Sequence, residues 1–311
     1  IVVGSRAVCQ SDCSGIGWPR VQNVINVNAD PVDVQHYNRT TALIGDAGDV
    51  LARLTQAVSE RPAVDRAAWL EACAAKKHEW NAFKAEQYSA ASPHDPVWGE
   101  PVLTQPQAVK IVADFCATVD ALKLFDAGDV QANGFQIVED DRPYETYTDT
   151  GASYMGFAAS ALLAGGLAEA GRYAVAFSGD GSFMMNPQVL LDGVEHGVHS
   201  TVVIFDNRRM AAISALQVAQ YGAEFRTNDS VAVEYVALAN AVSGVKGIWG
   251  GTDAAGLRAA LEEARAHEGL SLVHVPVDYG PDPAGGMGAY GQLNVGSWCE
   301  DVQRQYSETL I

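Results

Sequence analysis

The feature that most constrains this chain is a predicted strand, glycine turn, helix and second strand in its second half. Residues 173–178 have the short apolar pattern of a buried strand and lead directly into Gly179-Asp180-Gly181. Asn186-Pro187 is typical of a helix start and predicts a helix over residues 187–196, and residues 201–205 predict a second buried strand. Two strands joined by a helix in this way run parallel. The sequence therefore predicts an α/β fold with a doubly wound, mostly parallel sheet.

Asp180 and Asn207 each lie two residues after the end of one of the two predicted strands. They are predicted to lie together, because the carboxyl ends of neighbouring parallel strands meet at one edge of the sheet. Gly179 and Gly181 leave room for backbone N–H groups to approach a ligand. Carboxylate and amide oxygens beside such a turn suit a Mg²⁺ ion that also holds phosphate oxygens. A glycine-aspartate turn by itself is also typical of an ordinary structural loop.

Gly179-Asp180-Gly181, with Asn207 following after 25 residues, resembles the cofactor signature of thiamine-diphosphate (ThDP) enzymes. The resemblance implies that ThDP and Mg²⁺ are the cofactors. It also implies that Mg²⁺ is bound by the side chains of Asp180 and Asn207 and by the backbone carbonyl of Arg209. Gly179, Gly181 and Ser182 are then expected to lie against the cofactor.

Two further segments are expected at the same edge of the sheet. Gly128-Asp129-Val130-Gln131 follows a predicted strand over residues 122–126, and its backbone amides, or the side-chain amide of Gln131, could bind diphosphate oxygens. Met155 lies in residues 151–156, a stretch that resembles the element whose large apolar residue supports the two rings of ThDP. A methionine packed in the core at a helix start is the alternative reading for Met155.

Arg208 and Met210 flank Arg209 and are candidates for substrate contacts at the rim of the site. The guanidinium groups of Arg208 and Arg209 could hold an anionic substrate by bidentate hydrogen bonds, although arginines in a loop also commonly face solvent. His196 and His199, beside the predicted magnesium helix, are interpreted as surface residues rather than acid/base groups.

Composition disfavours several classes of function. The 311-residue chain carries 38 Asp and Glu against 20 Lys and Arg, and this formal net charge of -18 argues against nucleic acid or an anionic membrane surface as a partner. Its five cysteines are scattered, so neither a disulfide framework nor a zinc site is indicated. No apolar run approaches about 18 residues and no signal peptide is visible, so a cytoplasmic protein is expected. A dinucleotide-binding protein is disfavoured because no Gly-x-Gly-x-x-Gly follows a predicted strand.

The chain is expected to have three parts. Residues 1–60 resemble the C-terminal part of the Rossmann-like middle domain of ThDP-dependent decarboxylases and carboligases. Residues 61–102 are a linker helix and loop, with an amphipathic helix from about residue 65 to residue 85. Residues 103–311 are expected to form the ThDP diphosphate-binding domain with a C-terminal arm, and a capping box at residues 104–107 opens its first helix.

Asp206-Asn207, the string at residues 221–226 and the tail at residues 290–296 most resemble the trihydroxycyclohexane-1,2-dione hydrolases of inositol catabolism. The tail departs from that family's pattern at Gln292 and Leu293. The resemblance implies cleavage or formation of a C–C bond next to the carbonyl of a 2-oxo acid or cyclic dione, through a carbanion at C2 of the cofactor. The alternatives are an acetolactate-synthase-like carboligase and a non-catalytic structural subunit of the same fold.

The resemblance also implies a partner. In this family a pyrimidine-binding domain supplies the glutamate that drives carbanion formation, and no residue of this chain is assigned that role. A predicted buried strand over residues 1–6 would also need neighbours in a sheet. We therefore expect a split enzyme in which a second polypeptide carries the pyrimidine-binding domain, in which this chain is inactive alone, and which assembles as a dimer of heterodimers.

Overall fold

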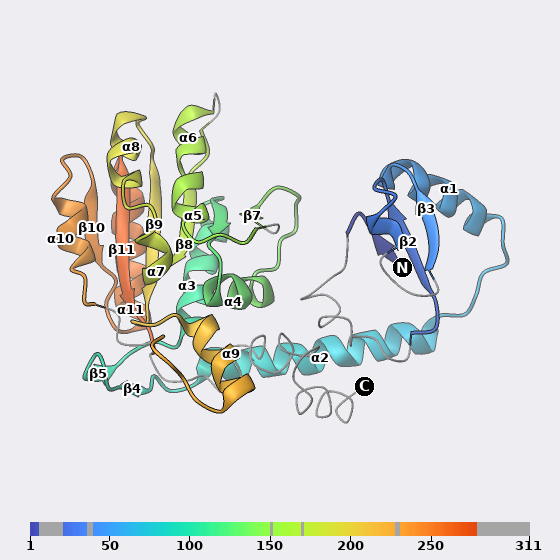
Figure 1. Ribbon diagram of the computed structural model, residues 1–311, viewed down its shortest axis with the longest axis horizontal. Coiled ribbons are helices and arrows are strands. Elements are labelled where there is room, and N and C mark those ends of the chain that lie inside the picture. The colour runs from blue at the N-terminus through green and yellow to red at the C-terminus, as the bar shows by residue number, and fades with distance from the viewer. Residues whose placement is uncertain (6–20, 36–39, 150–151, 169–170, 228–230, 279–311) are drawn as a thin grey trace. The chain divides into compact units, whose positions relative to one another are not determined.

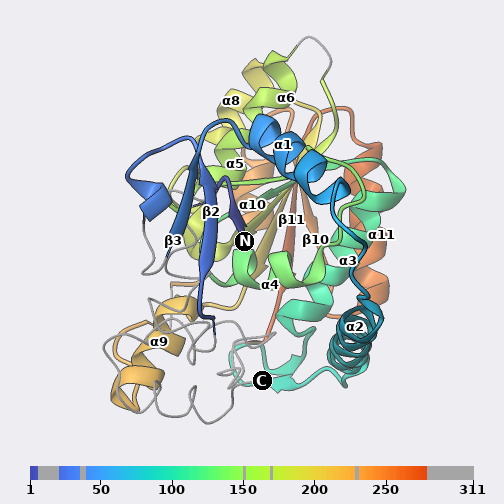
Figure 2. The ribbon, with the colours of Figure 1, turned by 90° about the vertical axis from the view of Figure 1, so that its right-hand side faces the viewer.

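The computed structural model describes residues 1–5, 21–35, 40–149, 152–168, 171–227 and 231–278. These residues fall into two compact units that divide in sequence between Trp80 and Asn81. The elements of both units are shown in Figure 1 and, turned by 90°, in Figure 2. Each unit is described by itself.

The unit that begins at Asn81 is built on a six-stranded sheet in which every neighbouring pair is parallel. The strand order is β10-β11-β9-β8-β6-β7. The strands are β6 (Leu122–Phe125), β7 (Thr146–Thr148), β8 (Ala174–Gly179), β9 (Ser200–Asp206), β10 (Lys246–Trp249) and β11 (Leu270–Pro276). The order reverses beside β6, since the chain runs from β6 outward to β7 and then back to β8. This sheet confirms the predicted α/β fold.

Helices cover both faces of the sheet. They are α3 (Gln105–Thr118), α4 (Asp129–Ile137), α5 (Phe157–Ala161), α6 (Leu163–Leu167), α7 (Asp180–Phe183), α8 (Val189–Glu195), α9 (Ala211–Tyr221), α10 (Tyr235–Asn240) and α11 (Ala254–Ala266). One hydrophobic cluster joins the sheet to α3, α4 and α11, and a second joins it to α5, α8 and α10. The sheet is therefore doubly wound.

The alternating side chains of the central strands build these two clusters. In β8, Val175 and Phe177 belong to the first cluster, whereas Ala174 and Ala176 belong to the second. Because successive side chains of a strand point to opposite faces, a strand covered on both sides is apolar throughout. This is why the central strands could be recognised in the sequence by short apolar runs, residues 174–177 in β8 and 202–205 in β9.

Helix α3 begins as its sequence predicts. The Thr104 side chain accepts a hydrogen bond from the Gln107 backbone N–H, and the Gln107 side chain accepts one from the Thr104 N–H. These two bonds form a capping box, which satisfies donors that the first helical turn leaves unpaired. A proline also lies in this first turn, where its missing N–H costs nothing.

Three predicted elements differ from the structure. The small residues from Ser153 to Ala170 predict a single helix, whereas the helix in the structure begins only after Gly156, whose φ is +94°, and is divided at Leu162. Asn186 does not cap α8, which begins at Val189; its side chain donates instead to the Ser160 hydroxyl at 2.8 Å. The sequence predicts a loop from Gln217 to Arg226, but this segment is helical as far as Tyr221 in α9.

The unit that ends at Trp80 contains a small parallel sheet, β1-β2-β3, and the helix α1. Its elements are β1 (Val2–Val3), β2 (Val24–Asn28), a 3₁₀ turn (Asp33–Gln35), β3 (Thr40–Ile44) and α1 (Ala47–Ser59). Among its described residues only Val24, Asn26, Val27 and Val34 are buried. The prediction of a buried strand over residues 1–6 is wrong, because β1 is a two-residue edge strand and Val3 is 38% exposed.

Helix α2 (Ala67–Ser89) continues from the first unit into the second. The apolar side chains expected to form a packed face are exposed in its first half, where Trp69 is 69% exposed. After α2, the expected linker forms a small antiparallel hairpin, β4 (His94–Asp95) and β5 (Glu100–Pro101). Asp95 is buried there and accepts hydrogen bonds from the N–H groups of Val97 and Trp98.

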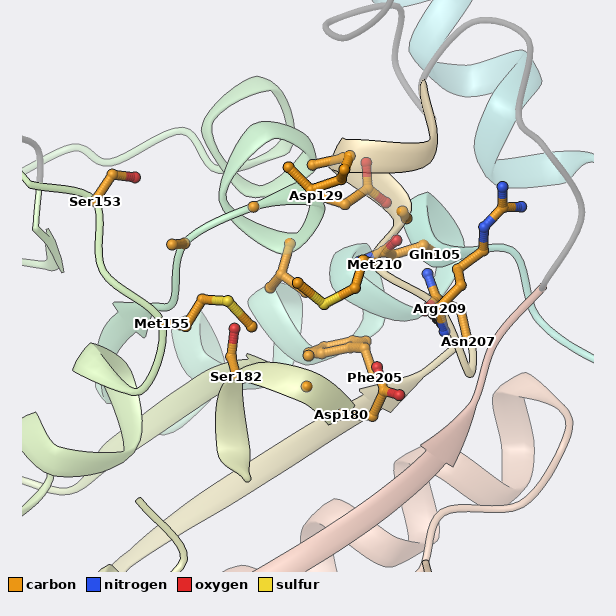
Figure 3. Close-up of a pocket in the computed structure, with 18 residues that line it drawn as sticks. Gln105, Asp129, Ser153, Met155, Asp180, Ser182, Phe205, Asn207, Arg209 and Met210 are labelled. Atoms are coloured by element: carbon orange, nitrogen blue, oxygen red, sulfur yellow. Dashed lines mark hydrogen bonds between the residues drawn. The ribbon is translucent and has the colours of Figure 1, made fainter. Parts of the chain in front are cut away.

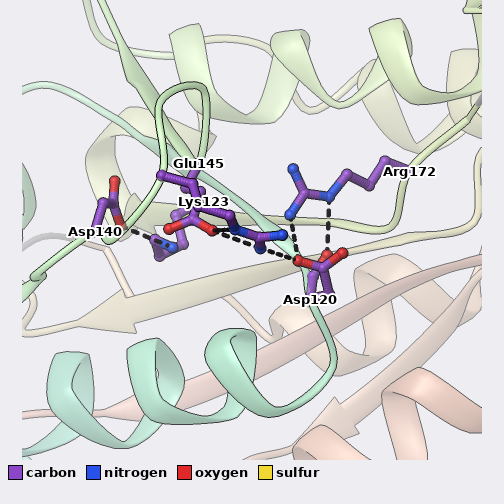
Figure 4. Close-up of polar contacts among 6 residues, drawn as sticks. Asp120, Lys123, Asp140, Glu145 and Arg172 are labelled. Atoms are coloured by element: carbon purple, nitrogen blue, oxygen red, sulfur yellow. Dashed lines mark hydrogen bonds and ion pairs between the residues drawn. The ribbon is translucent and has the colours of Figure 1, made fainter.

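Charged side chains gather near the amino ends of β6 and β7 (Figure 4). Asp120 forms ion pairs with Arg142 and Arg172, both at 2.6 Å. Lys123, which is buried, pairs with Asp140 at 3.0 Å. These contacts lie at the opposite end of β6 from the cavity described below.

No helix in the described ranges combines the length and apolar character needed to cross a membrane. Two of the cysteines also lie in these ranges, Cys73 on the surface and Cys116 in the core, and both are free thiols. Cys9, Cys13, Cys299 and the predicted tail at residues 290–296 lie outside the described residues.

Candidate functional site

A cavity of about 300 Å³ lies at the carboxyl ends of β6, β8 and β9 (Figure 3). It is at the point where the strand order reverses, which is where open α/β sheets bind ligands. All of the predicted cofactor and metal residues line it, as does Met210, whereas Arg208 is not part of its wall. The residues that line it are Gln105, Ala127, Gly128, Asp129, Val130, Ser153, Met155, Gly179, Asp180, Gly181, Ser182, Phe205, Asn207, Arg209, Met210, Ala211, Ala212 and Ile213.

Two helices begin at the wall of this cavity. Helix α4 starts at Asp129 after Gly128, whose φ of +92° is a left-handed conformation that favours glycine. Helix α7 starts at Asp180 directly after β8. The first N–H groups of a helix have no partner within the helix, so a cavity beside the start of α4 is suited to an anion such as a phosphate group.

Asp180 is the acidic side chain of the predicted metal set, and it is only 5% exposed. Burial, and then the negative charge of Asp206, raise the pKa of the Asp180 carboxyl from 3.8 to about 7. An ionised carboxylate in this position lacks the hydration that it would have in water, and a divalent cation would compensate for that loss. The electrostatics of the site therefore fit a bound Mg²⁺ ion.

Asn207 and Arg209 lie in the loop that follows β9. The Asn207 side chain is buried, and its Oδ1 atom accepts a hydrogen bond from the Arg209 N–H at 3.1 Å. Arg208 between them has a φ of +57°, in the left-handed region. An amide oxygen has two lone pairs, so Asn207 Oδ1 can still accept a second partner such as a cation.

The Arg209 side chain does not serve the cavity. It is buried, forms an ion pair with Glu224, and points away from the other labelled side chains in Figure 3. The hypothesis that the Arg209 guanidinium holds an anionic substrate is therefore wrong, because Glu224 already occupies that group. Arg208 lies outside the wall of the cavity, so Met210 is the candidate substrate residue that faces it.

Met155 and Met210 face each other across Gly181. A Cβ atom placed on Gly181 would lie 3.4 Å from both Met155 Cε and Met210 Sδ. Any larger side chain at position 181 would therefore occupy the space between the two methionines. Met155 is only partly buried, which argues against its alternative reading as a core residue. The narrow apolar space is of the kind that accepts a flat ring system.

Asp126, which the sequence did not single out, fixes the segment that carries Met155. It is fully buried at the end of β6 and accepts hydrogen bonds from the Gly156 N–H at 2.7 Å and from the Ser178 hydroxyl at 2.5 Å. The backbone N–H groups of Phe157 and Ala158 also interact with its carboxylate. Burial raises the pKa of Asp126, while these hydrogen bonds act in the opposite direction. The carboxylate thus anchors the start of α5 to the sheet.

Several other residues of the wall were also not anticipated. Ala211, Ala212 and Ile213, in the first turn of α9, form an apolar side of the cavity. They follow the metal loop directly in the sequence, which is the signal that could have identified them. Gln105 also lines the cavity, from the first turn of α3.

Gln131, the predicted side-chain amide donor, does not line the cavity. Its Nε2 atom donates to the Thr148 hydroxyl at 2.6 Å, and its Oε1 atom accepts from Ser153 at 3.3 Å. Across the described ranges, no group of three or more His, Cys, Asp or Glu side chains is arranged to hold a metal ion. The predicted set is of another kind, since it combines one carboxylate with an amide and a backbone carbonyl.

His196 is exposed, as its interpretation as a surface residue requires. His199 is partly buried, and its ring packs against Tyr173 and lies 3.0 Å from Arg265. Neither residue lines the cavity.

Comparison with known proteins agrees with this geometry. Residues 126–275 match the family described as thiamine pyrophosphate enzyme, C-terminal TPP binding domain, thiamine pyrophosphate being another name for ThDP. A 3D-(3,5/4)-trihydroxycyclohexane-1,2-dione hydrolase of Lacticaseibacillus casei is 27% identical over 83% of this chain and 43% of its own length. The large subunit of acetolactate synthase isozyme 2 of Escherichia coli is 27% identical over 82% of this chain and 43% of its own.

A solved structure shares the fold. The ThDP-dependent 4-hydroxybenzoylformate decarboxylase of Rhodococcus jostii superimposes with a TM-score of 0.63 at 18% identity, over 84% of this chain and 45% of its own. The chain thus spans less than half the length of the relatives that it matches.

Proposed function

Because this chain belongs to the family of thiamine-diphosphate-dependent enzymes, we propose that it binds the diphosphate end of ThDP through Mg²⁺ in an enzyme that cleaves or forms a C–C bond next to a carbonyl group. One observation carries the proposal. Asp180 and Asn207 line the same cavity as the start of α4, which supports a cation site beside a phosphate site.

The residues of the cavity have three roles in this proposal. Asp180, Asn207 and the carbonyl of Arg209 hold the Mg²⁺ ion. The backbone N–H groups of residues 128–130 and of Ser182 hold the diphosphate oxygens. Met155 lies against the rings of the cofactor, in the space that the absence of a side chain at Gly181 leaves open.

Bound ThDP supplies a nucleophilic carbon that attacks a substrate carbonyl. The chain itself positions the cofactor and shields the reacting atoms from water. Asp180 must lose its proton before it can bind the metal, and Met210, Ala211 and Ile213 present an apolar wall that limits access of water. The substrate that this wall favours is a neutral cyclic dione or the apolar end of a 2-oxo acid, because no side chain of the α9 wall carries a charge.

The binding proposal is tested by titrating the purified full chain, alone and with its partner, with Mg²⁺ and ThDP in a calorimeter. Binding of ThDP that requires Mg²⁺ is the expected result. Unchanged heat with or without Mg²⁺ would contradict it. A panel of cyclic diones and 2-oxo acids, with analysis of the products, then distinguishes hydrolysis from carboligation of the acetolactate synthase kind. Cofactor binding without turnover of any of them by the assembled enzyme would favour a non-catalytic subunit.

We further propose that a second polypeptide supplies the pyrimidine-binding domain and assembles with this chain as a dimer of heterodimers. Exposed apolar side chains in the first unit support this proposal, since α1 has no buried residue and Ile44 is 58% exposed. Mass spectrometry of the intact purified enzyme tests it; a stable, active homo-oligomer of these residues alone would refute the partner.

Filling the space at Gly181 should block the cofactor without unfolding the protein. Gly181→Val is expected to weaken binding of ThDP at least tenfold, because its side chain would reach between Met155 and Met210. Ala259→Val, which places the same valine side chain on the exposed side of α11, is the control and should bind ThDP like the wild type. Calorimetric titration measures both, and equal affinity of the two variants would contradict the proposed position of the cofactor.

A further inference from the structure

Behind the proposed metal loop lies a buried pair of polar residues that does not line the cavity. Nε2 of His274, in β11, is 2.9 Å from Oδ2 of Asp206, the last residue of β9. Asp206 is 1% exposed and His274 is 6% exposed. The two strands are parallel neighbours with Pro276 opposite Asp206, so His274 lies two residues away on the same face of the sheet.

The other oxygen of Asp206 controls the loop itself. Oδ1 accepts a hydrogen bond from the backbone N–H of Arg208 at 3.1 Å. This bond closes the turn in which Arg208 has its left-handed φ of +57°, an uncommon conformation for a residue with a side chain. The turn decides where Asn207 and the carbonyl of Arg209 lie, because they flank Arg208 on either side.

Three aromatic rings hold His274 in place. The rings of Tyr235, Trp249 and Trp98 have centroids 5.0, 5.1 and 5.9 Å from the imidazole, all in edge-on arrangements. The hydroxyl of Tyr235 also donates to the backbone carbonyl of Asp180 at 3.4 Å. The same cluster therefore contacts both segments that carry the proposed metal ligands.

From this arrangement we propose that His274 is a positioning residue for the metal site. The hydrogen bond from His274 orients the Asp206 carboxylate, and that carboxylate accepts the hydrogen bond that closes the Arg208 turn. The turn then orients Asn207 and the Arg209 carbonyl toward the cation. The proposal rests on the proposed Mg²⁺ site and adds a residue to it from outside the cavity. Groups that orient metal ligands in this way commonly change metal affinity by about 10- to 100-fold when they are replaced.

The test compares three variants of the full chain. His274→Phe keeps an aromatic ring but loses the nitrogen, and it should weaken Mg²⁺ affinity in the presence of ThDP about tenfold or more. His274→Gln can place an amide N–H near the position of Nε2, and it should restore most of that affinity. Tyr173→Phe removes another buried hydrogen bond of β9, the 2.6 Å bond to Thr201 at the opposite end of the strand, and should leave Mg²⁺ affinity unchanged.

A second readout does not depend on the metal. In His274→Phe the backbone N–H of Arg208 should exchange with deuterium faster than in the wild type, whereas Tyr173→Phe should not change it. Faster exchange together with a wild type that binds no Mg²⁺ would refute the proposed function but retain the role of His274 in holding the loop. Unchanged Arg208 exchange in His274→Phe, or an equal loss of Mg²⁺ affinity in Tyr173→Phe, would overturn the positioning role.

Discussion

Asp180→Asn should abolish Mg²⁺-dependent binding of ThDP. The substitution keeps the size of the side chain but removes the one charged ligand of the proposed octahedral site, and Mg²⁺ depends strongly on carboxylate ligands. We expect affinity for Mg²⁺ to fall by at least 100-fold in calorimetric titrations. Glu195→Gln, which removes a carboxylate from the exposed surface of α8, is the control and should bind like the wild type.

The same substitution should stabilise the metal-free protein at neutral and alkaline pH. The pKa of Asp180 in the folded chain is about 7, above its ordinary value of 3.8, so the folded state holds a proton that the unfolded state releases. The stability that this provides is present below about pH 4 and is lost as the pH rises towards 7 and beyond. The full difference corresponds to about 4 kcal/mol at most.

Asp180→Asn cannot ionise and should escape this loss. Urea unfolding of metal-free wild type and Asp180→Asn at pH 4 and pH 8 measures the effect, and the difference between them should be larger at pH 8. Saturating Mg²⁺ and ThDP should reverse the order, because only the wild type gains the binding energy. Wild-type affinity for Mg²⁺ should itself decrease below about pH 7, when Asp180 becomes protonated. An advantage of Asp180→Asn that does not grow with pH would contradict the burial of an ionisable group there.

The sheet could be predicted from the sequence because its central strands are buried on both faces. Strands β8 and β9 contain the apolar runs 174–177 and 202–205, and α11 carries a clear helical pattern between Ala254 and Ala266. The edge strand β7 has only three residues, two of them threonine, and gives no such signal. Helix α10 is only six residues long, too short to give a clear helical pattern, and the sequence analysis did not predict it.

The candidate site could be predicted in part because its residues follow strands that were recognisable. Asp180 and Asn207 are found by their spacing in the chain, and the sheet brings them to one edge. The partners of those residues come from elsewhere and leave no local pattern. Glu224 neutralises Arg209 from beyond α9, and His274 reaches Asp206 from 68 residues away. Only the three-dimensional structure could show that Arg209 forms an ion pair with Glu224 and that Asp206 is hydrogen-bonded to His274.

Asp126 shows how the fold and the site depend on each other. The sequence placed it at the end of a strand but gave no reason to assign it a task. In the structure its carboxylate accepts hydrogen bonds from the start of α5, directly after Met155, and from Ser178 in β8. It therefore connects the segment that carries Met155 to β6 and β8, the strands that precede α4 and α7.

Asp126→Ala should accordingly destabilise the protein and weaken cofactor binding together. It leaves the N–H groups of Gly156, Phe157 and Ala158 and the Ser178 hydroxyl without their acceptor in a site with no solvent exposure. Each such buried group costs about 1 to 3 kcal/mol, but relief of the buried charge and entry of water offset part of the sum, so we expect a loss of about 3 kcal/mol. Asp126→Asn, which keeps one acceptor oxygen, should lose less. Asp120→Asn, at the exposed end before β6, removes the charge from two ion pairs in water, suits the positive φ of that position, and should change stability little (Figure 4). Urea unfolding and ThDP titration of the three variants measure both effects; a loss in Asp120→Asn equal to that in Asp126→Ala would show that position 126 has no special role in anchoring Met155.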